Sequence, residues 1–483
     1  MNKPLRRVAI FCALLMLSLL LRDNWIQFVR GDSLANDPHN RRVQINEYAK
    51  PRGDIIVDGR AITGHATTSG SDFKYRRTYV NGPMWAPVTG YASQAFGTSL
   101  LEGVEDKILT GDDDRLFFNR TIDMFTGKTQ QGGDVVTTLN AKAQAAAYNG
   151  LGSKKGAVAA INPETGAILA LASTPSYDPA SFAGNSDKDA AAWQRLLKDP
   201  NQPMLNRALR QTYPPGSTFK VVTAAAALDD GLYSDIDTPT DSPLPYTLPQ
   251  TTRELVNEGN LPCRNATLRV ALRVSCNTVF GHIGAQLGKD KMLAAAKKFG
   301  FDQTLDIPVR AAQSVFPEQM DQPQTALSSI GQYDTAATPL QMAMVAGAVA
   351  NGGKLMTPYM VDQLRANLNV VDQTTPKELD QAMTPGTAQK LQQMMETVVQ
   401  SGTGTMAQIP GVTVGGKTGT AQHGEDNKAL PYAWFISYAK TAQGSPVAVA
   451  VVVEDGDANR DDISGGGLAA PIAKSVMEAV LNK

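Results

Sequence analysis

The residues with the clearest chemical potential are Ser217 and Lys220, in the tetrapeptide Ser-Thr-Phe-Lys. A serine hydroxyl attacks a carbonyl carbon only when a neighbouring base takes its proton. A lysine amine is such a base when burial or a nearby positive charge keeps it neutral. The apolar run that follows predicts a buried helix over residues 219–228. Because residues three apart share one face of a helix, the hydroxyl and the amine are expected to lie side by side.

The pattern S-x-x-K is not specific by itself, since the chain contains it three times. No helix is predicted after the copy at residues 71–74. The copy at residues 437–440 lies in a predicted strand, where residues three apart point to opposite faces. Only the copy at residues 217–220 places both groups together at the start of a helix.

Two further motifs follow in the order expected for enzymes that acylate a serine. S-x-N occurs once, at residues 275–277, and K-[ST]-G occurs once, at residues 417–419. Ser275 could relay a proton between Lys220 and a leaving amine. Asn277 could hydrogen-bond both Lys220 and a substrate amide. None of the four histidines falls within these motifs, so the lysine is the available base.

The third motif predicts a substrate-binding strand edge. The positive charge of Lys417 would help to depress the pKa of Lys220. Thr418 and Thr420 would hold a terminal carboxylate, and Gly419 suits a strand along which a peptide lies. The backbone amides of Ser217 and Thr420 would form an oxyanion hole.

Residues 411–418 also fit the phosphate-binding pattern G-x-x-x-x-G-K-[ST]. That loop works because a helix follows it and points its N-terminus at the phosphates. Here the residues between the two glycines alternate like a strand, and the residues after Thr418 show no helical periodicity. The sequence therefore disfavours a nucleotide site.

The whole chain of 483 residues has a globular composition, with 42% hydrophobic residues and a net charge of −1. This balance gives no indication of nucleic-acid binding. Near the N-terminus, basic residues precede apolar residues 8–21, and apolar character resumes at residues 25–29. The pattern predicts a single membrane-spanning helix with the later residues outside the cytoplasm. A cleaved signal peptide is the alternative, because residues 33–35 offer a weak cleavage site.

The remaining elements predict an α+β fold with an antiparallel sheet and a helical lobe. Residues 30–134 read as an irregular module, and a helix at 135–148 opens the second domain. Strands are expected at 156–163, 166–172, 412–421, 432–439 and 447–453, and helices at 219–228, 268–287, 289–299, 339–350, 385–400 and 468–481.

Several longer stretches carry a family resemblance. They are N-P-E-T-G-A-I-L-A-L-A-S-T-P-S-Y-D-P at 162–179, N-R-A at 206–208, Y-P-P-G-S-T-F-K at 213–220, T-P-L-Q-M-A at 338–343 and R-G-D-I-I-V-D at 52–58. The chain resembles the class B penicillin-binding proteins, the serine D,D-transpeptidases of cell-wall synthesis, and most closely their short actinobacterial type. Residues 328–333, S-S-I-G-Q-Y, depart slightly from the commoner I-G-Q-G.

The resemblance implies an anchor over residues 1–29, a membrane-proximal module over 30–134 and a transpeptidase domain of the penicillin-binding and serine β-lactamase-like fold over 135–483. It also implies that the chain cross-links peptidoglycan stem peptides through a serine acyl-enzyme, during division or elongation, and that β-lactams acylate it. The expected partners are a SEDS-type glycosyltransferase and other divisome or elongasome membrane proteins. No cofactor and no metal are expected.

Three alternative functions compete with this interpretation. A class A β-lactamase needs a glutamate in E-x-x-x-N, and Glu318, Glu378 and Glu396 all lack that context. A D,D-carboxypeptidase is excluded less firmly. A β-lactam sensor or a scaffold is disfavoured by the intact catalytic pattern. The sequence leaves open whether Cys263 and Cys276 pair, which diamino acid is accepted, and whether the protein serves septation or elongation.

Overall fold

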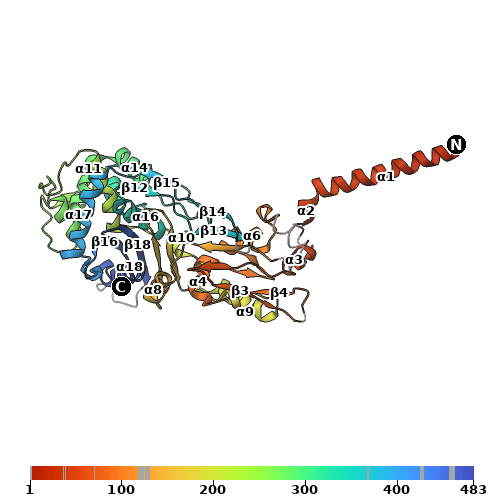
Figure 1. Ribbon diagram of the computed structural model, residues 1–483. Helices are drawn as coiled ribbons and strands as arrows, with labels where there is room; N and C mark the ends of the chain where they lie inside the picture. Colours follow the sequence, from red (N-terminus) through yellow and green to blue (C-terminus); the bar gives the residue numbers. More distant parts are fainter. Residues whose placement is uncertain are drawn as a thin grey trace.

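The computed structural model describes residues 3–35, 37, 40–69, 71–117, 125, 131–366, 369–424, 429–455 and 463–483. Figure 1 shows an elongated molecule. Helix α1 (Lys3–Val29) projects from one end, and the C-terminus lies in the larger body at the other end.

The larger body is built on a five-stranded sheet in the order β16-β17-β18-β8-β9, with every pair antiparallel. Its strands are β8 (Lys155–Ile161), β9 (Ile168–Thr174), β16 (Thr413–Ala421), β17 (Tyr432–Thr441) and β18 (Gly444–Asp455). Successive side chains enter different cores, because side chains alternate across a strand. Val449 and Val451 pack in the core with α8 (Ala141–Leu151) and α18 (Ala470–Leu481), whereas Ala448 and Ala450 pack in the core with α16 (Pro339–Ala350).

A helical lobe lies beside this sheet. It contains α11 (Lys220–Asp229), α12 (Leu268–Val274), α13 (Asn277–Leu287), α14 (Lys289–Lys298), α15 (Gln322–Ser328) and α17 (Pro385–Ser401). Helix α11 is buried along almost its whole length, as its apolar sequence predicts. The predicted α+β fold, with an antiparallel sheet and a helical lobe, is confirmed.

Two sequence predictions about helices were wrong. Residues 268–287 form two helices, because Ser275 adopts a left-handed conformation with φ 66° and ends α12. The predicted helix at 135–148 begins only at Ala141, where the Asn140 side chain accepts a hydrogen bond from the amide of Ala143. The residues before it form strand β7 (Asp134–Thr137), which pairs with two other strands.

A second five-stranded sheet, in the order β14-β13-β7-β1-β2, joins early and late parts of the chain. Strands β1 (Ile55–Val57), β2 (Arg60–Ala61) and β7 come from the first 137 residues, whereas β13 (Val361–Ala366) and β14 (Asn369–Gln373) come from much later. Strand β13 runs antiparallel to β7, with Leu364 opposite Val135. Backbone hydrogen bonds therefore connect the module beside α1 directly to the larger body.

The module next to α1 also contains a buried cluster of ionised side chains. The Glu102 carboxylate is fully buried and forms ion pairs with two arginines. It accepts hydrogen bonds from Arg52 Nε at 2.7 Å and from Arg77 Nε at 2.6 Å. Arg52 also reaches Asp106 at 2.8 Å. Burial by itself would raise the pKa of Glu102, but the two guanidinium groups outweigh burial and hold the pKa below its usual value. The strands of the module are short, so this cluster is an important contact between the segments that contain Arg52, Arg77 and Glu102.

Shorter helices and strands surround the two large sheets. In the module they are α2 (Gly31–Ala35), α3 (Arg41–Glu47), β3 (Thr63–Thr67), β4 (Tyr75–Tyr79), α4 (Gly82–Thr89), β5 (Ala92–Ser93), β6 (Gly97–Thr98), α5 (Leu100–Val104) and α6 (Asp106–Thr110). In the larger body they are α10 (Arg207–Arg210), β10 (Tyr246–Thr247), β11 (Glu254–Leu255), β12 (Lys354–Met356) and β15 (Glu378–Gln381). Helix α9 (Asp187–Lys198) lies against the module, where Trp193 contacts the rings of Tyr91 and Phe96 (Figure 1).

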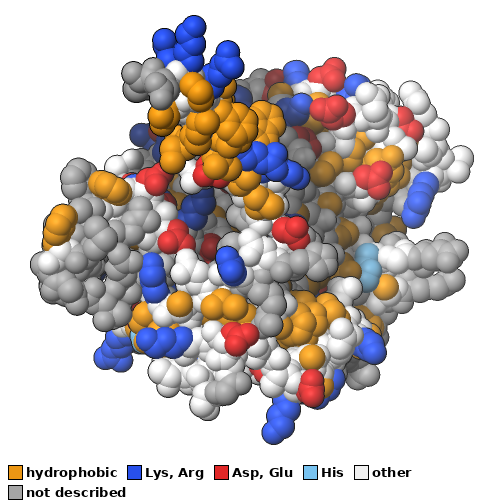
Figure 2. Space-filling model, turned by 90° about the vertical axis from the view of Figure 1, so that its right-hand side faces the viewer, with side chains coloured by type: hydrophobic (Ala, Val, Ile, Leu, Met, Phe, Trp, Pro, Cys, Tyr) orange, Lys and Arg blue, Asp and Glu red, His pale blue; other side chains and the backbone are white. Residues whose placement is uncertain are grey.

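Helix α1 is the one helix, within the described ranges, that is long and apolar enough to cross a membrane. Its 27 residues correspond to about 40 Å of helix, against a hydrocarbon core of about 30 Å. None of its residues is buried in the protein. Figure 2, viewed from the side of α1, shows apolar side chains gathered on this projecting helix and basic side chains at its tip.

Candidate active site

Ser217 lies in a short 3₁₀ turn, η3 (Gly216–Phe219), that leads directly into α11. The amide of Lys220 donates a hydrogen bond to the carbonyl oxygen of Ser217. In a 3₁₀ turn, residues three apart are eclipsed, so the two side chains extend from the same side. Ser217 is half-buried and lines a cavity of about 340 Å³. Lys220 is completely buried behind it.

The hydroxyl of Ser275 connects the two buried lysines. Lys220 Nζ donates to Ser275 Oγ at 3.2 Å, to the Ser275 carbonyl oxygen at 2.8 Å and to Asn277 Oδ1 at 2.6 Å. Lys417 Nζ donates to the same Ser275 Oγ at 2.9 Å and to the carbonyl oxygen of Thr418 at 2.9 Å. Three motifs that are far apart in the sequence thus meet at one hydroxyl group.

Burial lowers the pKa of both lysines. Burial lowers the pKa of Lys220 well below its ordinary value, and the nearby charge of Lys417 lowers it further. Burial also lowers the pKa of Lys417, to about 7. The carboxylate of Glu258 opposes both effects. The site therefore favours a neutral amine on Lys220, next to the Ser217 turn.

Strand β16 carries the third motif, and Thr420, the residue that follows the motif, reaches the same cavity. Thr420 is half-buried and lines the cavity. The hydroxyl of Thr418 is instead buried against the hydroxyl of Thr403, 2.6 Å away. A Cβ atom at Gly419 would lie 3.1 Å from the carbonyl oxygen of Pro215. Glycine at this position lets β16 pack closely against the turn that holds Ser217.

The turn that holds Ser217 is also supported from the opposite side. The amide of Gly216 donates to the carbonyl oxygen of Gly331 at 2.9 Å. Gly331 has φ +73°, and a Cβ atom there would lie 2.1 Å from the Gly216 carbonyl oxygen. Tyr333, at the end of the segment with the unusual sequence, has φ 60°, is 40% exposed and lines the cavity.

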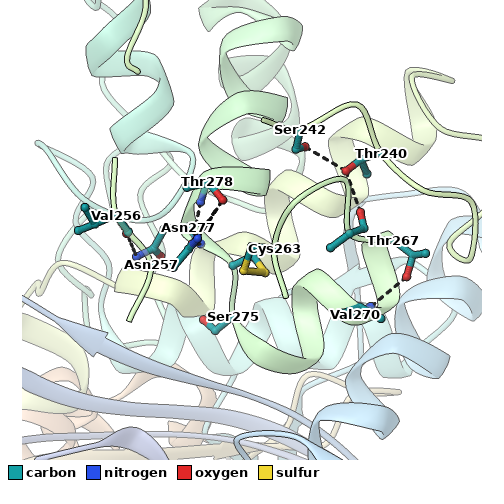
Figure 3. Close-up of a disulfide and its surroundings, with 12 residues drawn as sticks. Thr240, Ser242, Val256, Asn257, Cys263, Thr267, Val270, Ser275, Asn277 and Thr278 are labelled. Atoms are coloured by element: carbon teal, nitrogen blue, oxygen red, sulfur yellow. Dashed lines mark hydrogen bonds between the residues drawn. A yellow bond between two sulfur atoms is a disulfide. The ribbon is translucent and has the colours of Figure 1, made fainter. Parts of the chain in front are cut away.

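Asn257 is a site residue that sequence reasoning missed. Its Oδ1 atom accepts hydrogen bonds from the amides of Asn277 at 2.7 Å and Thr278 at 3.1 Å (Figure 3). The Asn277 side-chain amide donates in return to the carbonyl oxygen of Val256 at 2.9 Å. Asn257 therefore caps α13, whose first residue is Asn277. A capping residue usually directly precedes its helix. Asn257 lies 20 residues before Asn277, so no local pattern marked it as a cap.

The two cysteines whose pairing the sequence left open form a disulfide. Cys276 is the middle residue of the S-x-N motif, and Cys263 lies on the preceding loop, as Figure 3 shows beside Ser275. The disulfide and the Asn257 cap thus hold the same motif against the loop formed by residues 254–263.

A hydroxyl on a turn, a buried amine three residues later, and a second hydroxyl between two lysines define a serine acyl-transfer enzyme. Comparison with known families agrees with this class. Residues 156–478 match the penicillin binding protein transpeptidase domain, and residues 52–135 match the penicillin binding protein A dimerisation domain. The chain belongs to the penicillin-binding protein transpeptidase family, which confirms the resemblance seen in the sequence.

Relatives similar to this chain along its length carry specific names. The peptidoglycan D,D-transpeptidase PbpA of Mycolicibacterium smegmatis is 41% identical over 495 residues, covering 100% of both chains. PbpA of Mycobacterium tuberculosis is 42% identical over 496 residues, covering 100% of this chain and 99% of that protein. The structure of penicillin-binding protein A from M. tuberculosis as a ceftriaxone acyl-enzyme complex matches with a TM-score of 0.86 at 41% identity. It covers 90% of this chain and 100% of that chain.

Proposed function

We propose that Ser217 is the residue through which this chain acts as a peptidoglycan D,D-transpeptidase in cell-wall synthesis. The observation that carries the assignment is the Ser275 hydroxyl, which contacts both Lys220 and Lys417 beside the Ser217 turn. The relatives named D,D-transpeptidases, which span the full chain, supply the reaction class.

In the first step, Lys220 accepts the proton of the Ser217 hydroxyl. A neutral amine has two N–H groups. Lys220 can donate one to Asn277 Oδ1 and the other to the Ser275 carbonyl oxygen, its two shorter hydrogen bonds. Its lone pair is then free for the proton. Ser217 Oγ forms a bond to the carbonyl carbon of the penultimate D-alanine. The amide C–N bond breaks, and the proton passes from Lys220 through the Ser275 hydroxyl to the departing D-alanine nitrogen.

In the second step, the amine of a neighbouring stem peptide attacks the acyl-enzyme. The new amide C–N bond forms and the ester C–O bond to Ser217 breaks. The proton that the attacking nitrogen loses returns through Lys220 to Ser217 Oγ. Serine and lysine thereby recover their starting states, and the net product is one cross-link and one free D-alanine.

Strand β16 would bind the donor peptide. Thr420 faces the cavity and would hold the terminal carboxylate, together with the charge of Lys417. Thr418, which is hydrogen-bonded to Thr403, would support carboxylate binding through these two hydroxyl groups. Gly419 would support it by keeping the strand close to Ser217. The amides of Ser217 and Thr420 would stabilise the oxyanion, where one donor is worth about 3 kcal/mol.

The assignment is tested by incubating the protein with a fluorescent penicillin and weighing the product. A β-lactam mimics the donor, so the expected result is a stable adduct of one penicillin, located by peptide mapping at Ser217. An adduct at another residue would refute the role of Ser217. Rapid release of hydrolysed penicillin would indicate a β-lactamase-like hydrolase instead, and release of D-alanine from a stem peptide without cross-linking would indicate a carboxypeptidase.

We further propose the arrangement of the chain relative to the membrane. Residues 1–29 would form a single-pass anchor, residues 30–134 a membrane-proximal module, and residues 135–483 an extracytoplasmic catalytic domain. The basic residues before the apolar part of α1 support this orientation. A SEDS-type glycosyltransferase and divisome or elongasome membrane proteins would contact the anchor and the module.

The Asn257 cap gives a prediction of its own. Asn257→Ala is expected to reduce the rate of penicillin acylation by about fivefold, because loss of an N-cap costs about 1 kcal/mol and frees the segment that orients Asn277. The rate of fluorescent labelling measures the effect. Asn260→Ala, at an exposed position on the same loop, is the matched control and should acylate like the parent. Equal rates for the two variants would show that the cap does not position the motif.

A further inference from the structure

Glu258 lines the active-site cavity, which we call the groove, and neither reaction step uses this residue. It is exposed and lines the same cavity as Ser217 and Asn277. Within the part of the chain that the structure describes, its carboxylate forms no ion pair and no hydrogen bond. A charged group in an active-site groove, free of partners from its own chain, is available to a ligand.

The backbone on either side of Glu258 is held in place. Asn257, its neighbour, accepts hydrogen bonds from two amides at the start of α13, and Val256 accepts one from the Asn277 side chain (Figure 3). The Asn257 side-chain amide also donates to Thr278 Oγ1 at 3.1 Å. Four hydrogen bonds thus fasten this short segment beside the S-x-N motif. The position of Glu258 at the groove is a consequence of the fold.

The charge of Glu258 works against the preparation of the base. It raises the pKa of both Lys220 and Lys417, which burial lowers. The other charged side chains that line the cavity are Arg253 and Glu254. A site that depends on a neutral Lys220 gains nothing from this anion during attack by Ser217. The exposed carboxylate is instead suited to a positively charged group that enters the groove.

The two peptides of the reaction differ in charge at their reacting ends. The donor ends in a carboxylate, which Glu258 would repel. The acceptor presents an amine, which in water is an ammonium with a pKa of about 10. The two walls of the groove also differ. Strand β16 packs on the turn that holds Ser217. The segment of residues 256–258 is instead hydrogen-bonded to the start of α13. The donor strand edge and Glu258 therefore belong to separate walls.

We propose that Glu258 binds the ammonium group of the acceptor stem peptide and directs it to the acyl-enzyme. The inference rests on the proposed function and deepens it, since it assigns a residue to acceptor recognition. Binding involves no covalent change. Because Glu258 is exposed, the ammonium can pass one proton to solvent water, and the neutral amine then attacks the acyl-enzyme in the covalent step already described.

The test separates acceptor recognition from acylation. The full-length protein in detergent micelles is given a D-alanyl thioester donor and one of two acceptors, Nα-acetyl-lysine amide or hydroxylamine. The lysine derivative is cationic at neutral pH, and hydroxylamine is uncharged. Glu258→Gln keeps the shape of the side chain and removes its charge. It is expected to reduce aminolysis by the lysine derivative about fivefold, the upper range for an exposed ion pair. Aminolysis by hydroxylamine and acylation by fluorescent penicillin should not fall below half the parental rates, because removing the Glu258 charge lowers the pKa of Lys220 further and keeps that base neutral.

Every other outcome overturns the proposal. Equal losses with both acceptors, or a matching loss in penicillin acylation, would show that Glu258 acts through the lysines. No loss with either acceptor would show that it has no role. Glu254→Gln removes the same charge four residues earlier, and an equal loss there would indicate the general negative charge of the groove. If the parent protein forms no adduct at Ser217, the proposed function fails, and that result is independent of Glu258.

Discussion

Replacing Lys220 by methionine is expected to lower the rate of penicillin acylation about a thousandfold. Methionine has similar length and suits a buried position, but it cannot accept the Ser217 proton, and general-base catalysis contributes about 10²–10⁴-fold. Stopped-flow or gel measurement of fluorescent penicillin labelling gives the rate. Lys298→Met, at an exposed position on α14 in the same lobe, is the control and should label like the parent.

The pH profile distinguishes loss of a base from loss of folding. The pKa of Lys220 lies well below its ordinary value because of burial and Lys417. Lys220 is therefore neutral above that depressed pKa and protonated below it. Acylation of the parent should fall as the pH drops through this value, and the residual rate of Lys220→Met should lack that acidic limb. Retention of a tenth or more of the parental rate by Lys220→Met, with an unchanged circular dichroism spectrum, would remove Lys220 from the role of base.

Replacing Glu102 by alanine is expected to destabilise the module beside α1 by about 3–5 kcal/mol, the usual effect of removing one partner from a buried ion pair. The change leaves two buried guanidinium groups, of Arg52 and Arg77, facing each other without the carboxylate between them. Hydrogen exchange of the backbone amides in β1 and β7 reports the free energy of local opening. A change below about 1 kcal/mol would contradict a structural role for the cluster.

Neighbouring arginines on strand β4 provide the matched comparison for this cluster. Arg77 is buried against Glu102, whereas Arg76 points the other way and is exposed. Arg77→Ala should increase exchange in the module in the same direction as Glu102→Ala. Arg76→Ala should leave exchange unchanged, although it removes the same charge from the adjacent position. If both arginine variants behave alike, net charge and not the buried contact determines stability.

The sequence predicted the parts of the site that rest on local patterns. The apolar run after Ser217 indicated a buried helix, and burial is what depresses the pKa of Lys220. The strands β8, β9, β16, β17 and β18 were also found close to their expected ranges, because alternation or strong apolar character marked each of them. Order and residue type also selected the copy of S-x-x-K at residues 217–220, whose Lys220 lies within hydrogen-bonding distance of Ser275.

What the sequence did not predict depends on contacts between distant segments. Ser275 ends a helix in a left-handed conformation without being glycine or asparagine, so no residue type marked the break. The Asn257 cap and the Cys263–Cys276 disulfide both reach across loops. Thr418 was expected to contact substrate directly, and its bond to Thr403 depends on packing between β16 and a loop.

The sheet shared by β7 and β13 has a mechanical consequence. Residues 361–366 and 369–373 mix polar and apolar side chains, and no strand was predicted there from the sequence, yet they form β13 and β14 and extend the sheet of the module. A hinge between the module and the larger body would have to break the ladder between Val135 and Leu364. The module and the larger body are therefore expected to move as one rigid unit. A force or torque applied near α1 would then change the orientation of the groove at the distant end.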